Sequence, residues 1–177
     1  MKYIYLFIFS CAYCGNIFSQ CATDYECKLE NIAQIIAEKV KNSEWSRIAV
    51  LDFRTNSNTI TQFCELITDD LSAELSNLTN NEKNFTIIER KTIAPIVEEA
   101  MIIYNGDEQK IAQMLKRRGD VELVITGMIT EMAEEYKLTI KILVCEDGRI
   151  LGSTKSKIYI TKTLSEYFIA VHKKSYL

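Results

Sequence analysis

Few side chains in this sequence have the type and setting that catalysis requires. Serines and cysteines occur, but none stands in a G-x-S-x-G nucleophile elbow, and both the P-loop and the G-x-G-x-x-G phosphate-binding motifs are missing. The single histidine, His172, lies five residues from the end beside Lys173 and Lys174, a position typical of a solvent-exposed side chain. We therefore expect no enzyme, no catalytic residues and no cofactor.

Asp52 is the carboxylate with the most informative setting. It interrupts an apolar run near the carboxyl end of a predicted strand, where α/β proteins place functional groups. A buried carboxylate needs hydrogen bonds or a positive partner, and Arg54 or Arg90 could supply one. Two interpretations stay open for Asp52, Arg54 and Arg90: a structural tether, which the pattern favours, and contact with a ligand or partner.

The cysteines do not have the spacing of a metal site. Cys21, Cys27, Cys64 and Cys145 remain once an export signal is removed, with no C-x-x-C pair among them. We therefore expect no bound metal. Four cysteines allow three disulfide pairings, of which Cys21–Cys27 closes the shortest loop. Cys64 and Cys145 fit equally well as buried apolar side chains of a helix and a strand.

Helical segments alternate with strands in the first two thirds of the chain. Residues 25–41 repeat apolar side chains at helical spacing, and Thr61 can cap a second helix that runs to about Leu78. A third helix contains Pro95 and ends at Asn105-Gly106. Asp107 is expected to cap a fourth, over 108–118, which Gly119 ends.

The strands define the predicted fold class. Residues 47–53 and 85–90 are apolar runs, each followed by a helix, with loops at 54–58 and 80–84. Residues 121–132, 136–145 and 150–161 alternate as strands, and Asp147-Gly148 marks a hairpin turn. We predict an α/β (α+β) fold. Its mixed sheet has about five strands, the first two linked by a helical crossover and the last three antiparallel, with helices packed on the sheet.

The first residues have the layout of an export signal. Lys2 is followed by an apolar run too short to span a bilayer permanently, which takes about 20 residues. Small Ser19 favours cleavage before Gln20, while Cys11 and Cys21 are alternative lipidation sites. We expect a signal peptide at 1–19, an N-terminal helical segment at 20–44 and one α/β domain at 45–177.

The charge of the mature chain argues against nucleic acid as a partner. Only Lys2 is charged within residues 1–19, so removing them changes the net charge from −3 to −4. Phosphate binding needs a basic face. The one basic cluster, residues 116–118, fits a helix end, where cations complement the helix dipole.

Four segments in the same order resemble one protein family. Residues 48–53 (Ile-Ala-Val-Leu-Asp-Phe) resemble its I-A-V-L-D-F strand, and 85–90 (Phe-Thr-Ile-Ile-Glu-Arg) its F-x-V-V-E-R strand. Residues 124–130 (Val-Ile-Thr-Gly-Met-Ile-Thr) resemble its I-V-x-G-x-V-T strand, and 144–151 its V-D-x-x-T-G-E-I-L hairpin. The chain thus resembles the bacterial envelope superfamily of CsgG-like curli secretion proteins, FlgO-like flagellar outer-membrane proteins, LpoB-like penicillin-binding-protein activators and TolB N-terminal-like domains.

The departures from the family pattern refine the prediction. The family usually has Leu-Gly-Ala-Asp before its third strand, where residues 118–121 read Arg-Gly-Asp-Val, and Cys145 replaces an aspartate. Curli-type pores carry long inserts between strands, whereas 133–135 and 146–149 are only turns. We therefore place the chain nearest the FlgO-like branch.

The resemblance implies a function without a reaction, because the family shares a scaffold rather than a chemistry. It implies a non-enzymatic accessory protein of the periplasm or of the periplasmic face of the outer membrane. Such a protein would bind an envelope protein, or itself, and support assembly or secretion of a surface structure; a membrane would be contacted only through a lipid anchor. The loop 54–60, the last strand and a C-terminal helix at 165–172 are the expected contact surfaces. The alternative is a periplasmic small-ligand-binding or sensory module.

Overall fold

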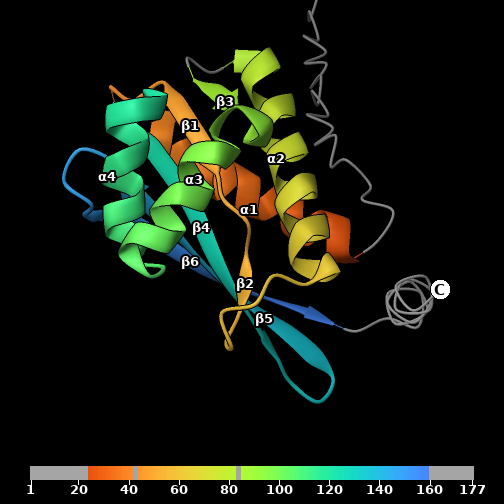
Figure 1. Cartoon of the computed structure of the whole chain (residues 1–177). Coiled ribbons are helices and arrows are strands. Elements are labelled where there is room, and N and C mark those ends of the chain that lie inside the picture. The colour runs from red at the N-terminus through yellow and green to blue at the C-terminus, as the bar shows by residue number, and fades with distance from the viewer. Residues whose placement is uncertain (1–23, 42–43, 83–84, 160–177) are drawn as a thin grey trace, which may run out of the picture.

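Four helices and six strands build the described part of the chain (Figure 1). The computed structural model describes residues 24–41, 44–82 and 85–159, so the expected export signal and C-terminal helix lie outside it. The helices are α1 (Asp24–Lys41), α2 (Gln62–Glu82), α3 (Arg90–Tyr104) and α4 (Glu108–Gly119). The strands are β1 (Arg47–Val50), β2 (Arg54–Thr55), β3 (Thr86–Ile88), β4 (Leu123–Glu131), β5 (Glu135–Val144) and β6 (Ile150–Tyr159).

The strands form one mixed sheet in the order β3-β1-β4-β5-β6. β1 lies between β3 and β4 and is parallel to both, while β4, β5 and β6 are antiparallel neighbours. The connection from β1 to β3 runs through α2, which is the helical crossover that two parallel strands require. The predicted mixed α/β fold is confirmed.

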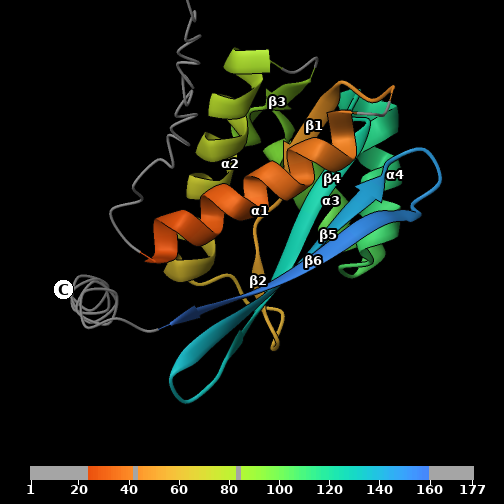
Figure 2. The same cartoon turned by 180° about the vertical axis from the view of Figure 1, so that it is seen from behind.

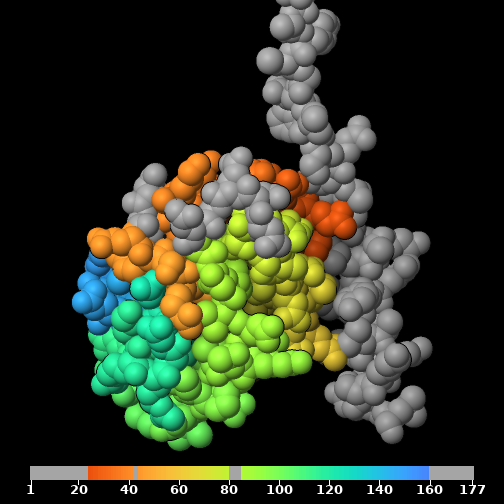
Figure 3. Space-filling model, turned by 90° about the horizontal axis from the view of Figure 1, so that it is seen from above, coloured from red at the N-terminus to blue at the C-terminus, as the bar shows by residue number. Residues whose placement is uncertain are grey.

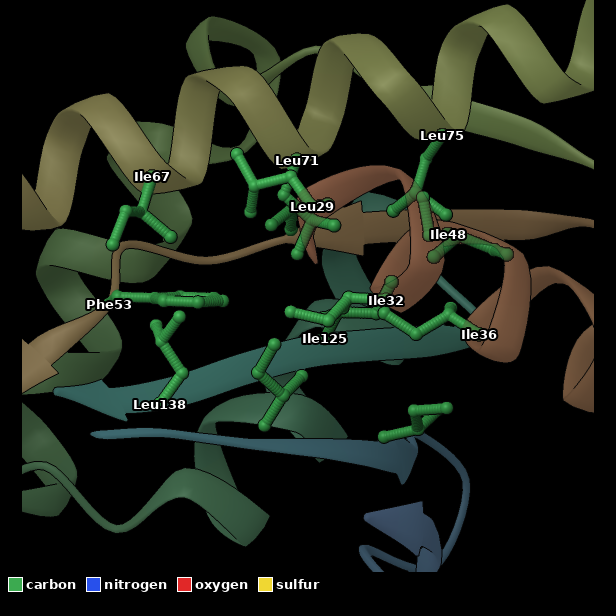
Figure 4. Close-up of a cluster of buried hydrophobic side chains, with 14 of the residues drawn as sticks. Leu29, Ile32, Ile36, Ile48, Phe53, Ile67, Leu71, Leu75, Ile125 and Leu138 are labelled. Atoms are coloured by element: carbon green, nitrogen blue, oxygen red, sulfur yellow. The ribbon is translucent and has the colours of Figure 1, made fainter. Parts of the chain in front are cut away.

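Helices cover both faces of the sheet. α1 and α2 pack on one face, where Ile36 and Leu71 join the side chains of Ile125 and Leu138 in the larger core (Figures 2 and 4). α3 and α4 pack on the other face over a smaller core that includes Ile93. Because helices cover both faces, the central strands are apolar on both sides. The edge strand β6 is not.

Asp52 lies in a short interruption between β1 and β2. Val50 pairs with Ile125 and Arg54 with Met128, so the three residues 51–53 lie opposite only two residues of β4. One extra residue of this kind re-aims the side chains around it. Phe53 therefore turns back into the larger core, where its ring lies against Gly127. The polar loop expected at 54–58 is wrong at its start, because β4 outlasts β1 and takes Arg54–Thr55 as a further partner.

The predicted helix boundaries are confirmed at two caps and wrong at two ends. Gly119 does not stop α4 but is its last residue, and Asp120, with a φ of 51°, takes the left-handed conformation after it. The Thr61 Oγ1 accepts from the backbone N–H of Cys64 at 3.3 Å. Asp107 Oδ1 accepts from the N–H groups of Gln109 and Lys110. α2 runs on to Glu82, past the loop expected from Asn80, because no glycine or proline stops it and asparagine costs only a few tenths of a kcal/mol in a helix.

Within the described ranges, none of the helices has the length and apolar character needed to cross a membrane. Most apolar residues of α1 are buried, Ile35 being an exposed exception, and the outer face of this helix carries charges. The described helices therefore belong to the packed layers of the domain.

Candidate functional site

Asp52 and Arg90 meet at the carboxyl ends of two neighbouring parallel strands. Asp52 follows β1, and Arg90 opens α3 directly after β3. Because β1 and β3 are parallel and paired, their ends lie side by side, and Arg90 Nη1 lies 2.7 Å from Asp52 Oδ1. Both atoms are buried. Among the described residues neither makes a hydrogen bond of regular geometry, so the ion pair is their main polar contact.

Asp69 adds a second carboxylate to this cluster from α2. Its Oδ1 lies 3.2 Å from the same Arg90 Nη1. Figure 3 shows the surfaces of α2 and α3 adjoining, as this contact requires. Asp70, its neighbour, accepts a hydrogen bond of 2.6 Å from the Tyr25 hydroxyl instead. Arg90 therefore joins the end of β1 to helices on both faces of the sheet.

A small hollow opens beside this ion pair. Its volume is about 210 Å³, and it is lined by the end of β1 and the first turns of α3: Val50, Leu51, Asp52, Arg90, Lys91, Ile93, Ala94, Val97 and Glu98. Pockets for drug-sized ligands usually have 300–1,000 Å³. The hollow is therefore too small to enclose such a ligand.

Arg54 lies near Asp52 but does not pair with it. Its Nη1 donates to the backbone and side-chain oxygens of Asn58, both at 3.3 Å, and its Nη2 lies 3.5 Å from Met101 Sδ. Arg54 and Asp52 both line a narrow second cavity of about 40 Å³. Of the two arginines considered as partners of Asp52, the structure selects Arg90.

A second polar cluster, which sequence reasoning missed, lies where α4 begins. Lys141 Nζ is 2.8 Å from Glu108 Oε2, and the hydroxyl of buried Thr126 is 3.5 Å from Glu108 Oε1. The signal available was Thr126 within an otherwise apolar strand, but the distant Glu108 and Lys141 gave no sign of meeting there. This cluster lies at the end of the smaller core where α4 begins.

The thiol of Cys145 is free and buried in the smaller core. Burial raises its pKa to about 12, so the thiol keeps its proton at neutral pH. Cys64 is also free and buried, and Cys64 Sγ lies 3.2 Å from the Thr61 hydroxyl. Within the described ranges, no group of three or more possible ligands gathers in a way that could hold a metal ion.

The remaining cysteine predictions concern the start of the chain. Cys27, in the first turn of α1, is disulfide-bonded, and its partner lies outside the described residues. Cys21 and Cys11 also lie outside them. The Cys21–Cys27 pairing and the two lipidation sites therefore stay predictions.

The layers and the polar cluster at the strand ends define a three-layer α/β domain with a mixed sheet. The chain belongs to the family of the curli production assembly/transport component CsgG, whose family model matches residues 28–139. The resemblance to the bacterial envelope superfamily is thereby confirmed, while the position nearest the FlgO-like branch stays a prediction.

Solved structures of LpoB share this fold. The LpoB C-terminal domain from Salmonella enterica is 15% identical and has a TM-score of 0.58; the match covers 78% of this chain and 100% of that one. The LpoB C-terminal domain from Escherichia coli gives the same identity and coverage with a TM-score of 0.54. At this identity the likeness extends to the fold alone. No curated protein matches the chain.

Proposed function

We propose that this protein is a non-enzymatic accessory factor of the bacterial cell envelope. It acts in the periplasm or at the periplasmic face of the outer membrane, where it binds an envelope protein or a second copy of itself. Membership of the CsgG family is the observation that carries this proposal. The name of that family refers to assembly and transport of curli, which supports a role in building or exporting a surface structure.

The polar cluster fits this proposal as a structural tether. Arg90 ties together the end of β1 and a residue of α2, and the hollow beside it is too small for a drug-sized ligand. These observations weigh against a small-ligand site at this cluster, which is the place where the alternative of a small-ligand-binding or sensory module would put it. The surfaces available for a partner then lie elsewhere on the domain.

The loop after β2 is the first such surface. Residues 56–62 are exposed, and a wide groove of about 860 Å³ lies between this loop and the adjoining ends of β4 and β5. Its lining includes apolar Phe63 and Ile129 among hydroxyl groups. A groove of mixed polarity that is open on one side suits a protein segment.

Site-specific photo-crosslinking in the native bacterium tests the proposal. A photoreactive residue replaces exposed Ser57 in the groove loop or exposed Ser153 on β6, and exposed Asn77 on the outer side of α2 serves as the control position. We expect discrete adducts with an envelope protein or with the chain itself from Ser57 or Ser153, and none from Asn77. A strictly monomeric chain without adducts at either position would contradict the proposal.

A further inference from the structure

None of the described helices covers one part of the sheet. α3 and α4 cover the sheet only as far as the cluster of Glu108 and Lys141, and the lower ends of β4 and β5 extend beyond them (Figure 1). The register places Met128, Thr139 and Lys155 in one cross-strand row on this open face. Arg54 extends the same row on β2, beside Met128.

In the next row of the open face, two lysines lie directly opposite each other on neighbouring strands. Lys137 of β5 pairs in register with Lys157 of β6, and Lys155 projects from the same face of β6. Like charges directly opposite in a sheet are destabilising. Glu135 relieves only one of them, with its Oε1 2.6 Å from Lys157 Nζ. Among the described residues, no carboxylate lies within ion-pair distance of Lys137 or Lys155.

Among the described strands, β6 also forms an edge of the sheet. In the described part of the chain it pairs only with β5. From Ser153 to Tyr159 the pairing is regular, because the register shift lies earlier, beside Ile142 and Leu143. Within the described part of the chain, the backbone groups on the outer side of these seven residues have no strand partner over roughly 24 Å. An edge of this length can accept another strand.

The positive charges of the lysines on β6 determine what kind of strand can pair with this edge. If two copies of β6 paired, Lys155 and Lys157 of each copy would approach those of the other, and lysines at an edge oppose such pairing. Both lysines point to the same face because they are two residues apart. A strand added to β6 would therefore meet them with every second side chain.

We propose that the edge of β6 binds an extended acidic segment of the protein's envelope partner, with carboxylates at alternate positions. The backbone of the segment pairs with Ser153–Tyr159, and its carboxylates contact Lys155 and Lys157, with Lys137 adjacent. This inference rests on the proposed function and names the chemistry of its partner. An anionic lipid surface is disfavoured, because it cannot use the backbone groups of the edge and because the chain as a whole is acidic, with a net charge of −3.

The test measures binding of labelled peptides to the full, processed chain by fluorescence anisotropy. The probe is a decapeptide of alternating threonine and glutamate. A decapeptide of alternating proline and glutamate has the same charge but lacks half of the backbone N–H donors. Vesicles of phosphatidylethanolamine and phosphatidylglycerol form a third probe. We expect binding of the threonine–glutamate peptide, weakened by salt, and weaker binding of the proline–glutamate peptide.

The matched variants carry the same change in net charge. Lys137→Glu/Lys155→Glu reverses two charges of the open face and should weaken binding of the threonine–glutamate peptide about tenfold. Lys41→Glu/Lys91→Glu reverses two exposed lysines, at the end of α1 and the start of α3, that are not in the rows of Lys137 and Lys155, and this variant should leave the affinity unchanged. Because the first variant removes the repulsion between Lys137 and Lys157, we expect it to fold at least as stably as the wild type.

Each contrary outcome overturns the inference in a different way. Equal affinity for both peptides would show charge attraction without strand addition. Binding to vesicles but not to the peptide would assign the face to lipid. Absence of all binding, or a loss that both variants share, would reject the acidic segment, while crosslinks at Ser57 or Ser153 would still support the proposed function.

Discussion

Arg90 connects three elements at the end of the parallel part of the sheet. It lies within ion-pair distance of Asp52 from β1 and of Asp69 from α2, so one guanidinium holds two carboxylates that are far apart in the sequence. Both Asp52 and Arg90 keep 35% of their side-chain surface exposed, and water therefore screens the pair. Its contribution to stability is modest, and its main effect is to fix the orientation of the segment between β1 and β2.

Replacing Asp52 by alanine tests the tether interpretation. We expect Asp52→Ala to lower the free energy of unfolding by about 0.5 kcal/mol, because the pair is partly exposed and Asp69 still contacts Arg90. Urea denaturation measures the change. The double variant Asp52→Ala/Asp69→Ala should lose more than the two single variants together, since it leaves Arg90 without either carboxylate. Unchanged stability combined with lost crosslinking to a partner would instead assign Asp52 to a binding surface.

Thr68 supports the same segment from inside the larger core. Its side chain is fully buried, and its Oγ1 accepts from the N–H of Phe53 at 3.1 Å and donates to the carbonyl of Cys64 at 2.7 Å. Thr68→Val keeps the shape but leaves the Phe53 N–H without a partner, which should cost about 1–3 kcal/mol. Thr79→Val on the half-buried end of α2 is the control, and its loss should be about 0.5 kcal/mol or less. Equal losses in thermal unfolding would refute this role of Thr68.

The site could be predicted from sequence only where local signals were strong. Asp52 stands out because a carboxylate within an apolar strand must be compensated, and the two candidate partners included Arg90. The choice between Arg54 and Arg90 depends on which strand lies beside β1, and spacing along the chain does not give that order. Thr68 and Glu108 escaped notice because each lies on a helix where its type is ordinary.

Strand length explains most of what sequence patterns could not predict at the level of elements. β1 has four residues and β4 has nine, so β1 alone cannot pair along the whole of β4. β2 continues the pairing with only two residues, too few for a period-2 pattern to show. The longer strands β4, β5 and β6 alternate clearly, and the prediction is within two residues at both ends of β4 and β5 and agrees at the start of β6; its predicted end at residue 161 lies outside the described residues.

The carboxylate of Glu122 connects the start of β1 to the segment before β4. Because this carboxylate can be protonated, the connection depends on pH. Glu122 Oε2 accepts hydrogen bonds from the backbone N–H groups of Ser46 at 2.6 Å and Arg47 at 3.0 Å. The bond from Ser46 is the main cause that lowers the pKa of Glu122 below its ordinary 4.5. A lowered pKa in the folded state means stability that is complete above pH 4.5 and is lost as the pH falls through the folded value.

We therefore expect the wild type to lose stability more steeply below pH 4.5 than Glu122→Gln, which is less stable at neutral pH. Thermal unfolding between neutral and acidic pH measures both curves. Glu38→Gln, on the exposed side of α1, should follow the wild type throughout. Parallel curves for Glu122→Gln and the wild type would show that the two backbone bonds do not depend on the charge.

The molecule as a whole shows how far a scaffold can persist while its sequence changes. At 15% identity to the LpoB domains, this chain still covers their full length with the same fold. Buried strand positions such as Ile48 and Ile125 need only apolar side chains of suitable volume, so many sequences satisfy them. Surfaces have no such constraint. If the proposed function holds, the lysines of the open face and the loop after β2 are where we expect the choice of partner to be encoded.

Under the proposed function, the predicted processing of the N-terminus would decide whether the domain is free in the periplasm or tethered to a membrane. Cys27 is disulfide-bonded, and the two other cysteines of the described residues, Cys64 and Cys145, are free. Cleavage before Gln20 would leave Cys21 as the one remaining candidate partner in the mature chain. A thioether-lipidated Cys21 could not form that bond, so lipidation there and a Cys21–Cys27 bridge exclude each other.

We predict that the native chain begins at Gln20 and carries the Cys21–Cys27 bridge. Mass spectrometry of the protein isolated from the bacterium, mapped with and without reduction, should find the N-terminal peptide joined to Cys27 and free of lipid. Cys64 and Cys145 are internal controls, because both are buried and should react with an alkylating agent only after unfolding. A diacylglycerol mass on Cys21 would refute the bridge, whereas a lipid on Cys11 would move the start of the mature chain and tether the domain through a longer linker.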